Sequence, residues 1–275
     1  MSTPAVRVSG VSKVFGSGHN NEVRALDMID LVVETGEFVS LIGPSGCGKS
    51  TLLRLIADLV GCTAGEIAVN GKTAHAARMD QDYGIAFQAA GLLEWRTVSA
   101  NIELPLELHG VSKRDRRARA LELLELVGLA EFASHRPSQL SGGMQQRVAI
   151  ARALAEKPSL LLMDEPFGAL DEMTRERMQA ELVRICAETA TTVVFVTHSI
   201  PEAVYLSDRV VVMSARPGRI AAIVDVTLGQ RGENTRESSQ FFAKITEVRE
   251  ALRGNAPSAG QSPLGAVPAS TVDTR

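Results

Sequence analysis

The chain has 275 residues, enough to bury a large core as one domain with a subdomain or as two domains. Hydrophobic residues make up 45% and charged residues 22%, and the net charge of −3 lacks the basic excess that usually accompanies nucleic-acid binding. Its cysteines, Cys47, Cys62 and Cys186, form no C-x-x-C pair, which argues against a disulfide framework and favours a reducing compartment.

The first residues lack a positive region followed by an apolar core, and no apolar run approaches the length of a membrane span. We therefore expect neither a signal peptide nor a transmembrane helix. If the protein acts in transport, another chain must form the pore.

Short apolar runs predict a series of strands along the chain. The first is expected at residues 6–14, where valines alternate, and a polar loop follows at 17–21. The strand at 65–69 should close on a tight turn at Asn70-Gly71. The other strands are expected at residues 31–33, 38–42, 84–87, 160–163, 193–196, 210–213 and 220–226.

Residues 43–51, GPSGCGKST, follow one of these strands and match G-x-x-x-x-G-K-[ST], the loop that wraps phosphate groups. Gly43 and Gly48 allow a tight turn whose N–H groups point into one concavity. A helix starting near Lys49 adds its positive end, Lys49 adds a charge for phosphate, and the Ser50 hydroxyl can ligate Mg²⁺. We read Cys47 as a small residue that fits the loop. The predicted phosphate-binding residues are Gly43, Pro44, Ser45, Gly46, Cys47, Gly48, Lys49, Ser50 and Thr51.

A helical insertion interrupts the alternation, because the sequence from 98 to 127 is rich in Leu, Glu, Arg and Ala. Leu121, Leu123, Leu124 and Val127 follow a helical pattern that stops at Gly128. Within the insertion, the cationic cluster at 113–119 is interpreted as a solvated helix face, with contact to an anionic membrane surface as the alternative.

The predicted domain organisation follows from these changes of texture. Residues 1–230 form the main domain, with a helical subdomain at about 90–156 inserted in its core. A further helix is expected at about 171–189. A helical extension at 231–253 precedes a Gly-, Ala-, Pro- and Ser-rich tail at 254–275, which is expected to be disordered.

Residues 140–147, LSGGMQQR, and 160–166, LLLMDEP, complete a set of motifs. With them the chain resembles the ATPase subunits of ABC transporters over about residues 6–226. LSGGMQQR looks like the family signature, LLLMDEP like its Walker B strand, and 167–171 like its D-loop. By the same resemblance, Gln88 is the Q-loop glutamine, His198 the switch histidine and Phe15 the adenine-stacking aromatic, although an N-terminal Phe is often a core residue. The implied fold is α/β, a P-loop NTPase with a RecA-like core, N-terminal antiparallel β strands and a helical signature subdomain.

The predicted catalytic groups also make physical sense by themselves. A strand at 160–163 would expose Asp164 and Glu165 at its carboxyl end, the edge of an α/β sheet where ligands bind. Glu165 can polarise an attacking water, and His198, after the adjacent strand, would reach the same phosphate. The predicted catalytic residues are Glu165, His198 and Gln88, and the predicted Mg²⁺ site is Ser50, Gln88 and Asp164.

Ser141, Gly142 and Gly143 open a second helix N-terminus, which makes a second anion site. One nucleotide rarely needs two such sites from one chain. The resemblance implies that two subunits pack head-to-tail, so that the signature of one caps the γ-phosphate held by the other. The nucleotide contacts implied by this arrangement are Ser141, Gly142, Gly143, Gln145 and Asp171.

The stretches 91–98, GLLEWRTV, and 213–220, MSARPGRI, resemble the ATPases of nitrate, sulfonate and taurine importers and their relatives for pyrimidine precursors of thiamine. Glu94 stands where a proline is common, and Ala89-Ala90 replace a more polar pair, so the solute stays open. The resemblance implies ATP and Mg²⁺ as cofactors, a second ATPase subunit in a homodimer, two integral membrane permease subunits and an extracytoplasmic solute-binding protein acting indirectly. It also implies a peripheral position on the cytoplasmic face of the inner membrane and no nucleic-acid partner.

Other functions compete with import. A non-transport ABC ATPase typically carries paired cassettes or a long coiled-coil insertion, and an exporter its own membrane helices. A regulatory module without turnover would not need Glu165 and His198. Within the importer reading, Trp95 either meets the membrane subunit or packs into the helical subdomain.

Overall fold

The computed structural model describes residues 3–16, 22–229 and 231–254. The polar loop expected at 17–21 lies outside the described residues. So does the expected tail, apart from Gly254, which is instead the last residue of a helix.

The smaller of two sheets is antiparallel, with strand order β2-β1-β4-β5. Asn70 and Gly71, with φ of 50° and 76°, make the predicted two-residue turn, and Val69 pairs with Lys72 across it. Its strands are β1 (Val6–Phe15), β2 (Val23–Val33), β4 (Ala64–Val69) and β5 (Lys72–Thr73).

The main sheet has the order β10-β9-β3-β8-β7-β6 and is parallel except for β10, which pairs antiparallel with β9. Its central strands are buried throughout, as is expected of parallel strands covered on both faces. The strands are β3 (Phe38–Ile42), β6 (Tyr83–Ala86), β7 (Leu160–Asp164), β8 (Thr192–Val196), β9 (Arg209–Met213) and β10 (Ile220–Asp225).

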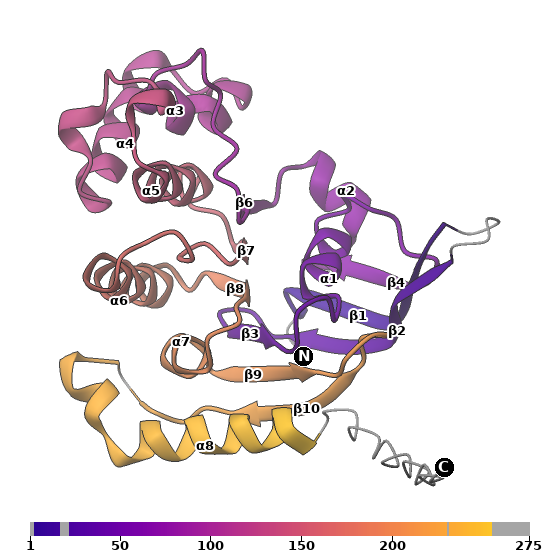
Figure 1. Ribbon diagram of the computed structural model, residues 1–275. Coiled ribbons are helices and arrows are strands. Elements are labelled where there is room, and N and C mark those ends of the chain that lie inside the picture. Colours follow the sequence, from indigo (N-terminus) through magenta and orange to yellow (C-terminus); the bar gives the residue numbers. More distant parts are fainter. Residues whose placement is uncertain (1–2, 17–21, 230, 255–275) are drawn as a thin grey trace, which may run out of the picture.

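Two hydrophobic clusters cover the two faces of this sheet. Val39, Leu41 and Val194 join the cluster that contains α1 (Lys49–Ile56) and the antiparallel sheet. Phe38 and Phe195 belong to the other cluster, which also contains buried side chains from the remaining long helices. Figure 1 shows that α1 lies between the two sheets. The helical subdomain lies at the other end of the molecule from the antiparallel sheet.

The helical subdomain contains α3 (Val98–Leu108), α4 (Lys113–Leu126), η1 (Ala130–Phe132), η2 (Pro137–Gln139) and α5 (Gly142–Ala153). Leu123, Leu124 and Val127 are buried as expected, whereas Leu121 is exposed. The buried residues of α3 and α4 belong to the same cluster as those of the main sheet, so the subdomain shares the core of the domain.

Part of the cationic cluster at 113–119 makes contacts within the chain. Arg116 pairs with Glu103 at 3.2 Å, and Arg119 donates to the carbonyls of Leu154 and Ala155, at the end of α5. A cation at a helix C-terminus is favourable because the helix dipole is negative there. These two arginines are thus mostly buried in contacts within the chain, with side chains 21% and 19% exposed, and do not lie on a solvated face as expected.

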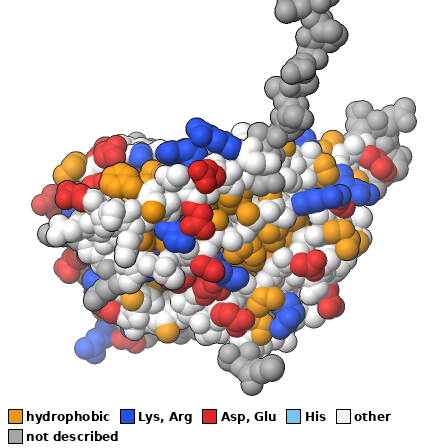
Figure 2. Space-filling view, turned by 90° about the horizontal axis from the view of Figure 1, so that it is seen from below, with side chains coloured by type: hydrophobic (Ala, Val, Ile, Leu, Met, Phe, Trp, Pro, Cys, Tyr) orange, Lys and Arg blue, Asp and Glu red, His pale blue; other side chains and the backbone are white. Residues whose placement is uncertain are grey.

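The C-terminal part of the chain packs against the last strands. α8 (Ser239–Gly254) buries Phe241, Ile245 and Val248 and contacts α7 (Ile200–Leu206) and β10. Figure 2 shows the face on the side of α8 and β10, where apolar side chains gather between charged side chains of both signs. The remaining helices are α2 (Ala74–Met79), α6 (Glu172–Thr189) and η3 (Glu233–Glu237). Among the helices of residues 3–16, 22–229 and 231–254, none has the length and hydropathy of a membrane-spanning segment.

The expected strands are confirmed to within one or two residues, with one larger correction. β2 begins at Val23 and not near Leu31. Its alternation is hidden by Asp27, a buried carboxylate that pairs with Arg24 and Arg219. The strand expected at 84–87 ends at Ala86. The short helices α2 and α7 were not expected, because neither is long enough to show a helical period.

Gly84 marks a contact of β6 with α5 that is too close for any side chain. A Cβ there would lie 2.1 Å from the carbonyl oxygen of Ala153 and 3.0 Å from Leu161. We expect Gly84→Ala to lower the free energy of unfolding by about 1–3 kcal/mol or more, because backbone must move to accept the methyl group. Urea denaturation would measure this.

Gly61→Ala is the matched control, because a Cβ at Gly61 meets nothing within 4 Å. Its effect should stay within about 0.5 kcal/mol. Equal stability of the two variants would contradict the close packing of β6 on α5.

Candidate functional site

The predicted site residues follow the carboxyl ends of adjacent strands of the main sheet. β3 leads into the phosphate loop, β8 into Thr197-His198, β7 into Glu165, and β6 toward Gln88. Because β3, β8, β7 and β6 are neighbours in this order and run parallel, these segments emerge along one edge.

The phosphate loop has the backbone that its glycines allow. Gly46 and Gly48 have φ of 73° and 102°, in the left-handed region that favours glycine. A Cβ on Gly48 would also lie 2.6 Å from Leu26. Gly48 caps α1 without a side-chain hydrogen bond, so the first N–H groups of α1 have no capping side chain competing with an anion.

Lys49 is the cation of this loop and is nearly buried, with 7% of its surface exposed. Its Nζ donates to the carbonyl oxygens of Gly43, at 2.9 Å, and Pro44, at 3.2 Å. These bonds hold the ammonium group inside the loop. Cys47, 1% exposed, packs into the core beneath the loop, in agreement with its reading as a small structural residue.

Ser50 and Asp164 bring two oxygen groups together from α1 and β7. The Ser50 hydroxyl donates to Oδ1 of Asp164 at 2.8 Å. Burial raises the pKa of Asp164, and the hydrogen bond from Ser50 opposes that rise. The hydroxyl of Ser50 and the carboxylate of Asp164 are both oxygen ligands, which suit a hard cation. A cation would also stabilise the buried negative charge of Asp164.

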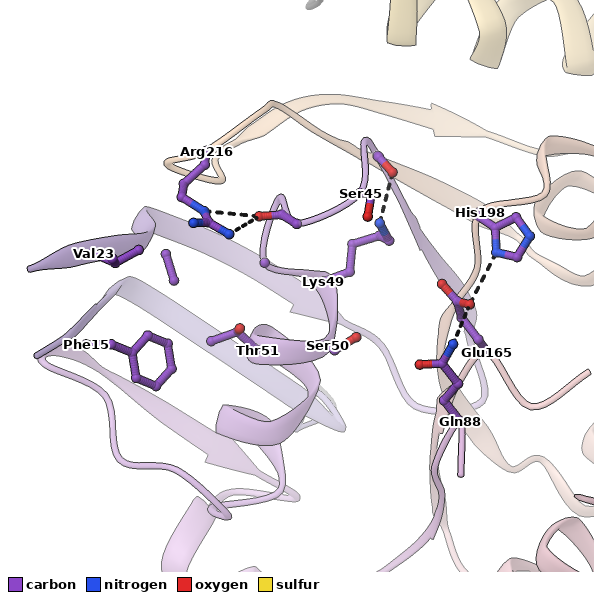
Figure 3. Close-up of a pocket in the computed structure, with 14 residues that line it drawn as sticks. Phe15, Val23, Ser45, Lys49, Ser50, Thr51, Gln88, Glu165, His198 and Arg216 are labelled. Atoms are coloured by element: carbon purple, nitrogen blue, oxygen red, sulfur yellow. Dashed lines mark hydrogen bonds and ion pairs between the residues drawn. The ribbon is translucent and has the colours of Figure 1, made fainter. Parts of the chain in front are cut away.

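Glu165 is the point on which the other predicted catalytic residues converge (Figure 3). Its Oε2 lies 3.4 Å from Nε2 of Gln88 and 3.3 Å from Nδ1 of His198. Glu165 has a φ of 48°, and its N–H donates to the carbonyl of Val196 at 2.9 Å. A left-handed conformation is uncommon for a residue with a side chain, and here it places the Glu165 side chain between Gln88 and His198.

These residues line a pocket of about 550 Å³ at the sheet edge. Figure 3 shows Phe15 at one end of it and Gln88, Glu165 and His198 at the other, with the phosphate loop between them. Phe15 is 41% exposed, and Nζ of Lys13 lies 4.9 Å from the centre of its ring. The pocket thus combines an aromatic face with a cationic loop.

Arg216, in the loop between β9 and β10, lines the same pocket and was not predicted as a site residue. Its guanidinium donates to the carbonyl of Gly46, with Nη2 at 3.2 Å and Nε at 3.3 Å (Figure 3). In the sequence, Arg216 falls in the stretch MSARPGRI, about 170 residues after the loop it contacts. No local pattern connects the two.

The signature residues lie outside this pocket. Ser141 caps α5 and accepts a hydrogen bond from the N–H of Met144 at 3.3 Å, as predicted for an N-cap. Gly143 approaches the segment 167–171, because a Cβ there would lie 3.0 Å from the carbonyl oxygen of Ala169. The pocket residues include none of Ser141, Gly142, Gly143, Gln145 and Asp171.

Gln145 and Asp171 make local structural contacts. The Gln145 amide donates to the carbonyls of Pro137, at 3.0 Å, and Leu140, at 3.4 Å. Asp171 caps α6 through the N–H of Thr174 at 3.0 Å, and this bond lowers the pKa of its carboxyl group. Their contact with a nucleotide stays a prediction.

Gln146, next to Gln145, is a connecting residue that the sequence did not reveal. It is 2% exposed, and its amide donates to the carbonyl of Phe87 at 2.8 Å. The signature helix α5 is therefore hydrogen-bonded to the residue that precedes Gln88.

Known proteins resemble this chain over most of its length. The family model for the ABC transporter matches residues 26–168. The taurine import ATP-binding protein of Rhizobium johnstonii is 46% identical over 90% of this chain and 95% of its own. The aliphatic sulfonates import ATP-binding protein of Bacillus cereus is 45% identical over 87% of this chain and 93% of its own. A solved dimeric ATP-binding cassette, in a post-hydrolysis state with ADP and Pi, matches with a TM-score of 0.75 and 37% identity, over 81% of this chain and 99% of that one.

The raised pKa of Asp164 predicts a pH-dependent cost in stability. The folded chain binds this proton more tightly than the unfolded chain, so the folded carboxylate is destabilising above its raised pKa, and the cost vanishes below the unfolded value. Without nucleotide or metal, Asp164→Asn should therefore raise Tm by about 2–4 °C at about pH 8, with the gain shrinking toward about pH 4. Thermal unfolding across this range measures it.

Asp225→Asn, which changes an exposed carboxylate on β10, is the control and should show no comparable gain. A gain for Asp164→Asn that grew as the pH fell would contradict the direction of the shift.

Proposed function

The chain belongs to the ABC transporter family as the ATP-hydrolysing subunit of an importer of the nitrate, sulfonate and taurine type, and from this we propose a role for each group in its site. The observation that carries the proposal is the convergence of Gln88 and His198 on Glu165, beside the phosphate loop.

The phosphate loop binds the triphosphate of ATP. Lys49 supplies a charge to the β- and γ-phosphates, and the N–H groups from Gly46 to Thr51 supply donors. Phe15 stacks on the adenine from the antiparallel sheet, a role supported by its exposure and its place in the pocket. Arg216, on the same side, adds a positive charge beside the loop.

Ser50 and Asp164 would hold Mg²⁺, together with Gln88, which lines the same pocket as Ser50. The donor set suits this ion, because Mg²⁺ prefers oxygen ligands and is usually bound by one or two protein groups together with substrate phosphates. The described residues contain no group of three or more His, Cys, Asp or Glu side chains that could form an all-protein metal site. When bound, the ion neutralises charge on the phosphates.

Glu165 orients and polarises the water that attacks the γ-phosphate, and His198 and Gln88 hold Glu165 and that phosphate in place. Phosphoryl transfer depends on positioning and charge neutralisation more than on covalent chemistry. A carboxylate between an amide donor and an imidazole has a fixed direction, which is what a positioning base requires.

Two copies of the chain form the complete site. The N-terminus of α5, with Ser141, Gly142 and Gly143, lies outside its own pocket, so it meets a nucleotide only across an interface. Gln145 and Asp171 belong to the same surface. A head-to-tail pair with twofold symmetry then encloses two nucleotides.

The dimer acts on two integral membrane permease subunits at the cytoplasmic face of the inner membrane, with an extracytoplasmic solute-binding protein as an indirect partner. A groove of about 320 Å³ lies between the end of β6 and the helical subdomain and includes the exposed Leu108. Trp95, between Gln88 and α3, is 70% exposed, which favours contact with a partner over packing. The solute itself is selected by the other subunits, and relatives named for taurine and sulfonates point to a small oxyanion.

Glu165→Gln tests the catalytic assignment. The variant should bind ATP with nearly unchanged affinity, because the phosphate loop is intact, while kcat falls by about 100-fold or more through loss of the polarising carboxylate. Steady-state hydrolysis and equilibrium binding of a fluorescent ATP analogue measure the two effects. Unchanged hydrolysis would remove Glu165 from the mechanism.

The same variant tests the dimer, because ATP that is bound but not hydrolysed should hold two copies together. Sedimentation should show a dimer with ATP and Mg²⁺ and a monomer without them. The control is Glu165→Gln combined with Ser141→Arg, which places a bulky cation at the interface and should stay monomeric. A Glu165→Gln monomer at saturating ATP would contradict the shared site.

Trp95→Ala tests the docking surface. Because Trp95 is largely exposed, its truncation should change the stability and ATPase activity of the isolated subunit little. Assembly with the membrane subunits should weaken by about 2 kcal/mol or more, as for a buried aromatic anchor. Co-purification and solute uptake measure the loss.

Phe242→Ala, on α8, is the control, since Phe242 is also an exposed aromatic residue, 57% accessible. It should leave assembly unchanged. A large loss of stability in Trp95→Ala with normal assembly would mean that Trp95 packs within the subunit.

A further inference from the structure

Three buried polar side chains, none of which lines the pocket, are bonded to one another and to the segment that carries His198. Thr197 is 1% exposed, Gln179 on α6 is 2% exposed and Glu202 on α7 is 8% exposed. Buried polar groups are costly unless they are hydrogen-bonded, so three together in one place require a common explanation.

The three side chains form a continuous line of hydrogen bonds. Thr197 Oγ1 donates to one carboxylate oxygen of Glu202, and Gln179 Nε2 donates to the other at 2.8 Å. Thr197 Oγ1 also accepts from the N–H of Ser199 at 3.0 Å. The carboxylate of Glu202 therefore holds the hydroxyl that fixes the backbone on both sides of His198.

This series of hydrogen bonds begins on the C-terminal extension, residues 231–253. Arg236, in η3, donates from Nη2 to Oε1 of Gln179 at 2.6 Å. Its guanidinium stacks on the ring of Tyr205, 3.6 Å from the ring centre, and Nε lies 3.7 Å from Glu176. Because Arg236 takes the amide oxygen of Gln179, the amide NH₂ group must point to Glu202.

The electrostatic environment of Glu202 is consistent with a carboxylate that accepts these hydrogen bonds. Burial raises the pKa of Glu202, while the bonds from Thr197 and Gln179 and the charges of Arg175 and His198 oppose that rise. Glu202 is thus a buried acid that depends on its donors, and Arg236 orients one of those donors.

His198 itself is not held by packing. Its side chain is 72% exposed, and its ring meets Glu165 at 3.3 Å. The backbone fixes the point from which an exposed ring extends, and hence whether the ring can reach Glu165. The backbone at residues 197–199 is tied to Glu202 through Thr197.

We propose that Arg236, Gln179, Glu202 and Thr197 form a positioning relay, through which the C-terminal extension sets the position of His198 and thereby the rate of ATP turnover. The inference rests on the role proposed for His198. Arg236 is then a positioning residue for hydrolysis, although it belongs to neither the phosphate loop nor the signature.

Arg236→Gln in the full chain tests the relay. The charged partner of Arg236, Glu176, has a side chain that is 46% exposed, so the substitution leaves no buried charge without a partner. We expect kcat to fall by about 3- to 10-fold, with KM for ATP unchanged, because the relay acts on His198 and not on the phosphate loop. The amide of a glutamine at this position is two bonds shorter than Nη2 of Arg236 and should not reach Gln179, whereas the longer side chain in Arg236→Lys keeps a donor near Gln179 and should recover most of the loss.

NMR of the histidine side chains supplies a readout that a general loss of stability would not reproduce. The His198 resonance is identified by its disappearance in His198→Ala. Arg236→Gln should shift this resonance while leaving those of His75 and His109 in place. Arg249→Gln, an exposed arginine on α8, is the matched control and should change neither kcat nor the spectrum.

The outcomes separate the relay from the proposed function. If His198→Ala hydrolyses ATP normally, the role of His198 is wrong and the relay falls with it. If His198→Ala is impaired but Arg236→Gln keeps its kcat and its His198 resonance, the relay alone is wrong. A fall in kcat without a shift of His198 would also overturn it.

Discussion

The parallel pairing of β3, β8, β7 and β6 is the constraint on which the site depends. Leu41 pairs with Val196, and Val196 with Asp164, so three strands end at one level. A slip of two residues in either pair would move Glu165 or His198 by about 6.6 Å along the sheet. The contact of Ser50 with Asp164, and those of Gln88 and His198 with Glu165, would then be lost. Hydrophobic packing on both faces keeps this register.

Local patterns in the sequence were sufficient for the central strands and the phosphate loop. Buried parallel strands are apolar at every position, as at Phe38–Ile42 and Leu160–Asp164, and the loop requires glycine where φ is positive. The strand β2 is longer than its apolar pattern predicts, because the buried Asp27 interrupts that pattern. One of the two arginines that pair with Asp27, Arg219, lies almost two hundred residues away, so the sequence near β2 does not reveal it. Arg216 and Gln146 have the same kind of explanation. Their partners, Gly46 and Phe87, are distant in sequence, and no spacing rule connects them.

Several residues of the site have a structural contact as well as a proposed chemical one. Ser141 and Asp171 each cap a helix, and Gln145 binds two carbonyls of the segment before α5. These contacts orient the helix ends that would face a second subunit. Glu165 differs, because its left-handed backbone destabilises the fold by about 1–3 kcal/mol. This conformation places its side chain between Gln88 and His198. The residue types predict the motif that contains Glu165, but they do not reveal the free-energy cost of its backbone conformation.

The hydrogen bond from Gln146 to the carbonyl of Phe87 limits how the helical subdomain can move. Breaking a buried hydrogen bond of a side-chain amide without a new partner costs about 1–3 kcal/mol. A rotation of α5 that left Phe87 in place would therefore be unfavourable. A rotation that carried Phe87 along would meet no such resistance, but it would also pull on the next residue, Gln88. Arg152, also on α5, donates to the carbonyls of Ala90 and Gly91 at 2.8 Å each, so the segment that follows Gln88 is bound to the same helix. A rotation of α5 that carries Phe87 with it therefore changes the position of Gln88, whose amide donates to Glu165.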